Sequence, residues 1–163
     1  MENIYIPWVV ALFFCAVGCV LGETNDVGET ESPPWRVIAQ GANSRIEEAT
    51  REVFQSEDAW HDWWRRHNPV VEYVNGKTVE PPPPEVDFSK ETVLAVTIGM
   101  RSTGGYAVSF AGIDYEGDTL VASLRYTAPG PDDMVTMALT APYAIIAVPR
   151  HEGPVRFVEK QEA

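Results

Sequence analysis

The sequence has only two cysteines, Cys15 and Cys19, and both lie in its N-terminal apolar segment. The rest of the chain therefore offers no disulfide, no cysteine-ligated zinc site and no thiol nucleophile. Basic residues are also scarce, because 12 Lys and Arg stand against 24 Asp and Glu, for a net charge of −12. Since an acidic surface repels phosphate backbones, we do not expect nucleic acid as a partner.

Motifs of hydrolytic and nucleotide-dependent enzymes are absent as well. The chain contains neither a Gly-x-Ser-x-Gly nucleophile turn nor a phosphate-binding Gly-x-x-x-x-Gly-Lys-Ser/Thr loop. It has three histidines. Two of them, His61 and His67, would lie about 120° apart around one helix, which is poor placement for a shared metal ion. We predict a protein that is not an enzyme and that carries neither a metal site nor a cofactor.

The N-terminus has the pattern of an export signal. Residues 6–21 form an uncharged apolar run, and the small residues 16–18 directly precede Cys19. This pattern is typical of a secretory signal and resembles a bacterial lipobox, whose cysteine is lipidated. The sequence therefore predicts an exported, membrane-anchored lipoprotein of the cell envelope, lipidated at Cys19. A secreted or periplasmic protein and an uncleaved membrane anchor are the alternatives, because the uncharged stretch approaches the length of about 20 residues that spans a bilayer.

Composition divides the chain into three parts. Residues 1–22 are the signal or lipoprotein segment, and residues 23–34 are acidic, without apolar periodicity, and end in two prolines. We expect this second part to be a flexible tether. Residues 35–160 contain the alternating and apolar runs of a folded domain.

A single helix is predicted over residues 57–67. Ser56 is a favourable N-cap, and acidic residues follow it in the first turn. Helical spacing places four aromatic side chains on one face: Trp60, Trp63, Trp64 and His67. We expect this face to pack on a sheet, and a sugar-stacking platform of exposed tryptophans is the alternative.

The remaining elements are predicted to be strands joined by short turns. Asn75-Gly76 predicts a hairpin, and residues 92–100 are apolar enough for a central strand. Gly112 interrupts an alternating run and predicts a bulge. Further strands are expected at 35–39, 51–54, 106–115, 118–126, 134–139, 143–148 and 155–159. The predicted fold class is α+β: a mainly antiparallel sheet of about six strands with the Trp-rich helix packed on it.

The loop after the central strand combines functional side chains with adjacent glycines. It contains Arg101, Thr103, Gly104, Gly105 and Tyr106. Arg101 can make a forked contact with a carboxylate, and Tyr106 offers a rigid aromatic surface. These five residues are the predicted partner-binding site. In the alternative, the glycines only turn the chain, Arg101 pairs internally with an acid such as Asp87, and Tyr106 belongs to the core.

The same loop carries a family resemblance. The motif Gly-x-Arg-x-Thr-Gly-Gly-Tyr over 99–106 resembles the C-terminal domain of the PrcB family of protease-complex subunits. Weaker matches lie in order along residues 35–160: Trp60-x-x-Trp63-Trp64-x-x-His67, Val86-Asp87-Phe88-Ser89-Lys90, Ala141-Pro142-Tyr143 and Val155-Arg156-Phe157. The resemblance implies a non-enzymatic envelope domain, since the family is named for a lipoprotein that associates with and stabilises a secreted protease.

The predicted function is therefore the binding and stabilisation of a partner protein, such as a secreted protease, by a membrane-tethered lipoprotein domain. A small-ligand or glycan-binding module and a protease inhibitor are the alternatives. A family resemblance is stronger evidence for the fold of this chain than for the identity of its partner.

Overall fold

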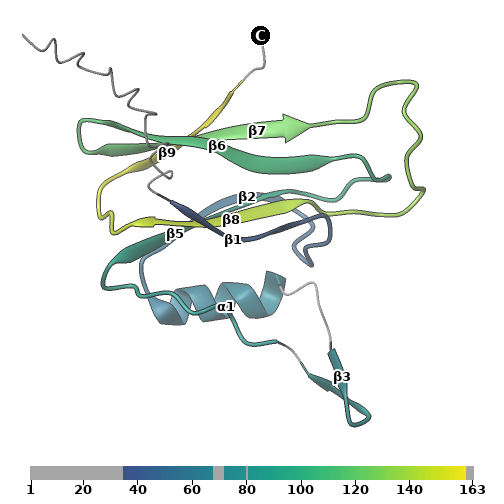
Figure 1. The fold of residues 1–163 in the computed structure, drawn as a ribbon, viewed down its shortest axis with the longest axis horizontal. Helices are drawn as coiled ribbons and strands as arrows, with labels where there is room; N and C mark the ends of the chain where they lie inside the picture. The colour runs from purple at the N-terminus through teal and green to yellow at the C-terminus, as the bar shows by residue number, and fades with distance from the viewer. Residues whose placement is uncertain (1–34, 68–71, 80, 161–163) are drawn as a thin grey trace, which may run out of the picture. The chain divides into compact units, whose positions relative to one another are not determined.

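The structure, a computed structural model, describes residues 35–67, 72–79 and 81–160, which all belong to the compact unit Glu31–Ala163. The predicted signal segment, the tether and Cys19 lie outside the described residues. Within the described part, the strands form two larger sheets and one small hairpin, and a single α-helix accompanies them (Figure 1).

The larger sheet has four antiparallel strands in the order β1-β8-β5-β2. Its members are β1 (Arg36–Gly41), β2 (Ala49–Phe54), β5 (Glu91–Ile98) and β8 (Tyr143–Pro149). The two central strands, β5 and β8, are buried along almost their whole length. This burial explains why their sequences are apolar almost throughout, since a strand covered on both faces needs apolar side chains at nearly every position.

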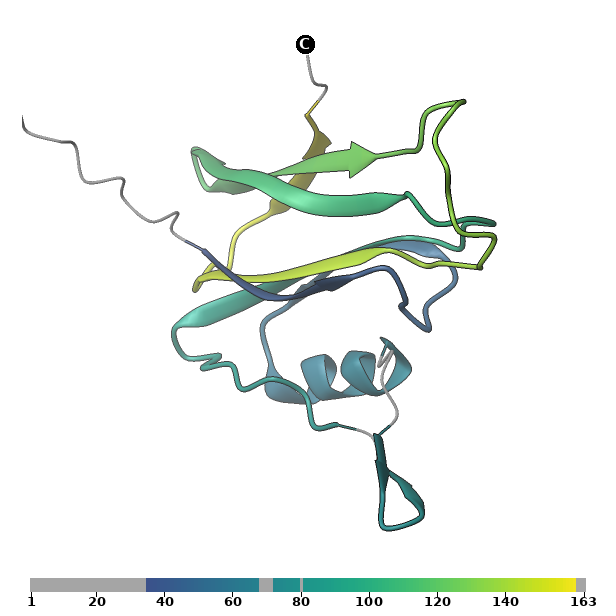
Figure 2. The same ribbon diagram turned by 45° about the vertical axis from the view of Figure 1, so that its right-hand side comes forward.

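The second sheet has three strands in the order β6-β7-β9. A tight turn at Gly117 joins β6 (Ala107–Glu116) to β7 (Thr119–Thr127), and β9 (Val155–Glu159) pairs with β7 in parallel. The pairing of β6 with β7 shifts register between Phe110 and Gly112, which confirms the predicted bulge. Figure 2 shows this sheet lying over one face of the four-stranded sheet.

The hairpin predicted at Asn75-Gly76 is present as β3 (Glu72–Val74) and β4 (Lys77–Val79). Both turn residues have positive φ, 51° at Asn75 and 76° at Gly76. Such a turn follows the right-handed twist of the paired strands, which is why this dipeptide predicts it well.

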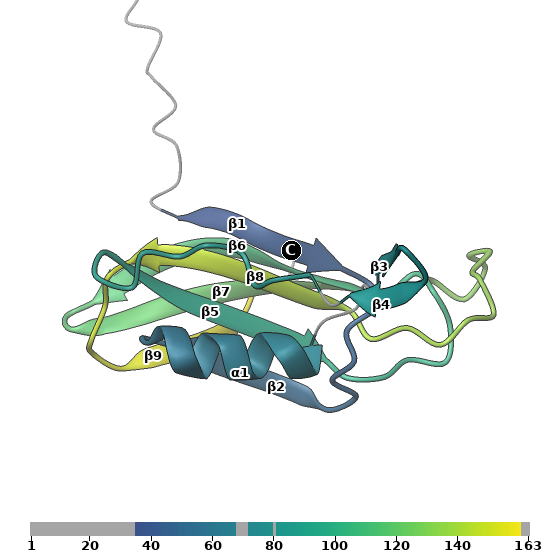
Figure 3. The ribbon, with the colours of Figure 1, turned by 90° about the horizontal axis from the view of Figure 1, so that it is seen from below.

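Helix α1 (Glu57–His67) lies on the other face of the four-stranded sheet, across β5 and β2 (Figure 3). The predicted face is the buried one, with Trp60, Trp63, Trp64 and His67 all inside. Two indole N–H groups donate to carbonyls of the proline run, from Trp60 to Pro84 at 3.2 Å and from Trp64 to Pro81 at 3.3 Å. The proline run therefore crosses over the helix and supplies hydrogen-bond acceptors for the two buried indole N–H groups.

The core consists of two layers on either side of the four-stranded sheet. One layer fills the space between the two sheets and includes Leu94, Phe110 and Ile146. The other lies beneath α1 and includes Phe54, Val93 and the tryptophans. The α+β class and the packing of the Trp-rich helix on a sheet are confirmed, and the strands divide between two packed sheets rather than forming one.

Candidate functional site

The loop 99–106 leaves the four-stranded sheet through a glycine that the packing requires. Gly99 has a φ of 76°, and a Cβ there would lie 3.0 Å from the carbonyl oxygen of Glu47. The next residue, Met100, donates its backbone N–H to the same oxygen at 2.8 Å. The chain therefore turns closely against the segment before β2, and any residue with a side chain would be strained at position 99.

The loop is then held by the connection between β7 and β8. Arg101 and Thr140 exchange two backbone hydrogen bonds, of 2.7 and 3.0 Å. The hydroxyl of Thr140 donates to the carbonyl of Thr103 at 2.8 Å, and Gly104 N–H donates to the carbonyl of Thr136 at 2.9 Å. Residues 99–106 and 134–140 thus form one connected surface, which we call the loop surface.

The adjacent glycines have a packing role. A Cβ on Gly104 would collide with the Thr136 hydroxyl. Gly105 has a φ of 87°, and its Cβ would lie 3.0 Å from Pro129 and from Val135. These contacts explain Gly104 and Gly105 without a ligand, and they fix the position of the backbone between Thr103 and Tyr106.

Arg101 is available to a partner. Its guanidinium carbon lies 5.5 Å from the centre of the Tyr106 ring, a cation–π arrangement, and the residue is exposed. Among the residues that the structure describes, no carboxylate pairs with this guanidinium. The internal partner considered above, Asp87, instead pairs with Lys90 at 2.8 Å and accepts bonds from Ser89, which together hold its pKa at about 2. Tyr106 is half-buried against the core between the sheets.

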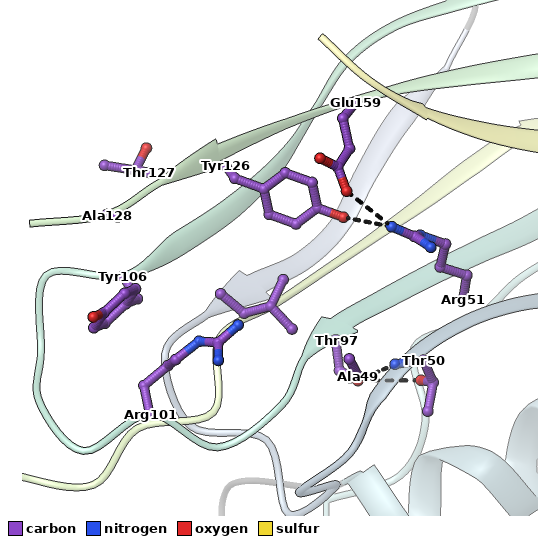
Figure 4. Close-up of a pocket in the computed structure, with 11 residues that line it drawn as sticks. Ala49, Thr50, Arg51, Thr97, Arg101, Tyr106, Tyr126, Thr127, Ala128 and Glu159 are labelled. Atoms are coloured by element: carbon purple, nitrogen blue, oxygen red, sulfur yellow. Dashed lines mark hydrogen bonds and ion pairs between the residues drawn. The ribbon is translucent and has the colours of Figure 1, made fainter. Parts of the chain in front are cut away.

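A pocket of about 400 Å³ opens beside Arg101 and Tyr106 (Figure 4). The first three residues of β2, the end of β5 and the ends of β7 and β9 line it. On the side opposite Arg101, Arg51 donates to the Tyr126 hydroxyl at 3.2 Å and pairs with Glu159 at 3.3 Å. The pocket therefore presents two guanidinium groups against one carboxylate, next to aromatic rings.

The structure corrects the strand predicted at residues 134–139. This segment is a loop between β7 and β8, and its large apolar side chains point to solvent: Met134 is fully exposed, Met137 is 88% exposed and Leu139 is 67% exposed. Methionine is not a typical strand residue, and turn residues flank the segment at 129–133. The methionines and the flanking turn residues both favour a loop. A prediction based on them would have placed these exposed side chains in the partner-binding site.

The tryptophans do not form a platform for a sugar. Trp60 is completely buried and Trp64 is 8% exposed, so neither ring offers a face to a ligand. Their rings instead make tilted contacts with one another, with Phe54 and with His67. Since a glycan-stacking site needs exposed rings, this arrangement argues against the glycan-binding alternative.

His67 and Ser44 form a polar contact at the end of the helix. Ser44 Oγ lies 2.9 Å from His67 Nδ1 and also accepts the backbone N–H of Ile46 at 3.0 Å. Burial lowers the pKa of His67 to about 4, so the ring is neutral at pH 7. Within the described residues, its Nε2 has no hydrogen-bond partner. The ring stacks on Trp63 and meets the edge of Tyr143, which is the setting of a core residue.

The described chain, residues 35–67, 72–79 and 81–160, has neither a metal-ligand cluster nor a membrane-spanning helix. No three side chains of His, Cys, Asp or Glu gather there closely enough to hold a metal ion. No helix in this part has the length and apolar character needed to span a membrane.

Comparison with protein families gave one match. Residues 92–149, from the start of β5 to the end of β8, match the family model described as PrcB C-terminal. Over these residues the match confirms the family resemblance found in the sequence, and this segment contains the whole loop surface. Comparisons with curated proteins and with solved structures gave no significant match. The PrcB-like family is an accessory, non-catalytic kind of domain associated with a protease complex.

Proposed function

We infer that this domain binds a partner protein of a protease complex through the loop surface and stabilises it, without catalysing a reaction. The observation that supports this most strongly is the composition of that surface. Arg101, which pairs with no carboxylate of the described residues, lies on the same connected pair of loops as the exposed Met134, Met137 and Leu139. Large apolar side chains gathered on a surface mark protein contact sites, and Arg and Met are enriched in such sites.

Methionine suits this role physically. Its unbranched thioether side chain adapts to irregular partner surfaces at little cost in strain. Met100, which is 41% exposed, adds a third thioether from the neighbouring loop. The predicted contact set of Arg101, Thr103, Gly104, Gly105 and Tyr106 thus becomes one half of the proposed surface. The glycines and Thr103 hold its shape, and Arg101 and Tyr106 supply side-chain contacts.

Stabilisation of the partner would follow from mass action. A protein that binds only the folded form of a protease raises the free energy of unfolding of that protease. The effect reaches about 2.7 kcal/mol when the free binder is at a hundredfold excess over its Kd. No catalytic group is needed for this effect.

The cellular setting belongs to the same proposal. The apolar run before Cys19 and the acidic tether that follows it support an exported domain, held at the membrane of the cell envelope by a lipid on Cys19. Replacing Cys19 with Ala should abolish lipid labelling of the chain. Unchanged labelling would contradict the lipoprotein assignment and leave the binding proposal intact.

The binding proposal is tested by capture with matched variants. The full chain is used to capture cross-linked proteins from its own envelope, with the double variant Met134→Ser, Met137→Ser beside it. The control is Val37→Ser, which removes an apolar side chain that is 56% exposed on β1. We expect the double variant to lose the partner and the control to keep it. Identical capture by all three proteins would contradict the proposed surface.

The captured partner then decides the mode of action. If it is a protease, its activity is followed at an elevated temperature with and without the domain. A stabiliser prolongs the activity and an inhibitor lowers it from the start, so an immediate fall in activity would overturn the stabiliser proposal.

A further inference from the structure

We propose that the pocket beside Arg101 holds the C-terminal end of an extended segment of the partner, with the terminal carboxylate bound by the Arg101 guanidinium. This inference rests on the proposed function, because it names the part of the partner that the domain holds. It concerns a separate cavity next to the loop surface, lined mainly by residues outside the two loops.

The charged side chains that line the pocket favour an anionic ligand group. The chain has a net charge of −12, yet this pocket has two guanidinium groups and one carboxylate. Glu159 is already engaged by Arg51, whereas the Arg101 guanidinium, within the described part of the chain, contacts the Tyr106 ring and no carboxylate. A guanidinium held against an aromatic ring keeps its outward N–H groups in a fixed fork, and that fork matches the two oxygens of a carboxylate.

The position of β2 in the sheet indicates that the ligand of the pocket is an extended peptide. β2 is an edge of the four-stranded sheet and pairs only with β5, so its outer backbone groups can pair with an added strand. Residues 49–51, which line the pocket, are the first residues of β2. An added strand antiparallel to β2 would approach the pocket with its C-terminal end leading, which places its terminal carboxylate near Arg101.

The floor of the pocket indicates the last side chain. Ile98 and Ala49 contribute apolar side chains to the pocket lining. The ring of Tyr126, on β7, closes the side toward the second sheet (Figure 4). In Figure 4 the Tyr126 hydroxyl faces Arg51, away from Tyr106 and Arg101. The space between Arg101 and Tyr126 therefore suits an apolar C-terminal side chain, such as leucine or valine, better than a charged one.

The test uses two peptide libraries. Randomised octapeptides are made once with free C-terminal carboxylates and once as C-terminal amides, and each library is passed over the immobilised full chain. Retained peptides are identified by mass spectrometry. We expect retention from the free-acid library at least about tenfold above the amide library, since a hydrogen bond to a charged group contributes on that scale. Retained sequences should end in an apolar residue.

Matched variants separate the pocket from general charge effects. Arg101→Gln should abolish the preference for the free acid, and Arg101→Lys should retain part of it because the charge stays and the fork is lost. Arg66→Gln removes the same charge from the exposed face of α1 and should behave as the wild type. Each variant is checked for an unchanged melting temperature, which we expect because Arg101 is exposed and makes only a ring contact through its side chain.

The pocket proposal would be overturned by no retention from either library, by equal retention of acids and amides, or by a free-acid preference that survives in Arg101→Gln. Retention of amidated peptides rich in Asp or Glu would assign the pocket to acidic side chains and would also overturn it.

The two proposals fail separately. The double variant Met134→Ser, Met137→Ser should keep the free-acid preference, because those side chains do not line the pocket. If the wild type shows no free-acid preference but still captures the partner, only the pocket proposal is contradicted. If the free-acid preference is intact but the double methionine variant captures the partner as well as the wild type does, only the loop-surface proposal is contradicted.

Discussion

His67 Nδ1 lies 2.9 Å from Ser44 Oγ, and this contact joins the last residue of α1 to the segment that enters β2. The backbone repeats the link, because Arg45 donates its N–H to the carbonyl of His67 at 3.0 Å. The end of the helix is thus anchored by a neutral ring inside an aromatic cluster.

Stability should therefore fall on acidification. The pKa of His67 is about 4 in the folded protein and near 6.5 in the unfolded chain, so the unfolded chain binds the extra proton between these values. The contribution of this group is complete above pH 6.5 and is lost as the pH falls toward 4. The loss should reach about 3 kcal/mol.

The measurement is urea unfolding at several pH values for the wild type and for His67→Gln. The variant starts from lower stability because of the altered packing, and its slope with pH should be shallower between pH 6.5 and 4. Parallel slopes in the two proteins would rule out His67 as the titrating group.

The tryptophans of α1 provide a matched pair. Trp60 and Trp63 are both completely or almost completely buried, but Trp60 Nε1 donates to Pro84 whereas Trp63 Nε1 has no partner among the described residues. Replacing either by Phe leaves a similar cavity. Trp60→Phe also leaves the Pro84 carbonyl without its donor, whereas Trp63→Phe removes a buried unpaired donor. We expect Trp60→Phe to cost about 1 kcal/mol more by chemical denaturation, and equal losses would contradict the hydrogen bond.

A side chain at Gly104 should displace a neighbour. Its Cβ would collide with the Thr136 hydroxyl, and because Thr136 is exposed and its hydroxyl can rotate, Gly104→Ala should lower the free energy of unfolding by about 1 kcal/mol. Adding Thr136→Ala should recover part of the loss, because that change removes the colliding group. Gly112→Ala is the control, since no atom lies within 4 Å of a Cβ there. A loss at position 112 as large as that at 104 would mean that the collision is not the cause.

The exposed methionines should be the first sites of oxidation. Dilute hydrogen peroxide should convert Met134 and Met137 to sulfoxides before Met100, which is 41% exposed. The fold should survive, because these side chains do not contribute to the core. Peptide mass spectrometry gives the order of oxidation, and partner capture should fall in step with it. Full capture by the oxidised protein would argue against a thioether contact.

Local signals predicted most of the elements. The helix bounds at 57–67, the hairpin at Asn75-Gly76 and the bulge at Gly112 each depend on residues close in sequence, and the structure has all three. The split into two sheets was not predictable, because strand alternation shows which residues are buried and not which sheet they join. The parallel pairing of β9 with β7 is likewise a long-range choice.

The candidate site was predicted in part for the same reason. Arg101 and Tyr106 stood out by residue type, but the role of Gly104 depends on Thr136, which lies far along the chain. The segment 134–139 has the apolar content of a strand, although its methionines and the turn residues before it favour a loop, and the structure adds that its large apolar side chains face solvent. The pocket combines residues from β2, β5, β7 and β9, so no local pattern could indicate it.

The pairing of β1 with β8 has a consequence for how the chain folds during synthesis. Arg36 pairs with Ala147, so the four-stranded sheet is complete only after almost the whole domain has left the ribosome or crossed a membrane. Contacts between such distant residues slow folding, because the closure entropy of a long loop precedes any stabilising contact. A nascent chain therefore displays its tryptophan-rich helix and the apolar strand β5 well before β8 arrives to cover them, and chaperones have their clearest binding opportunity during that interval.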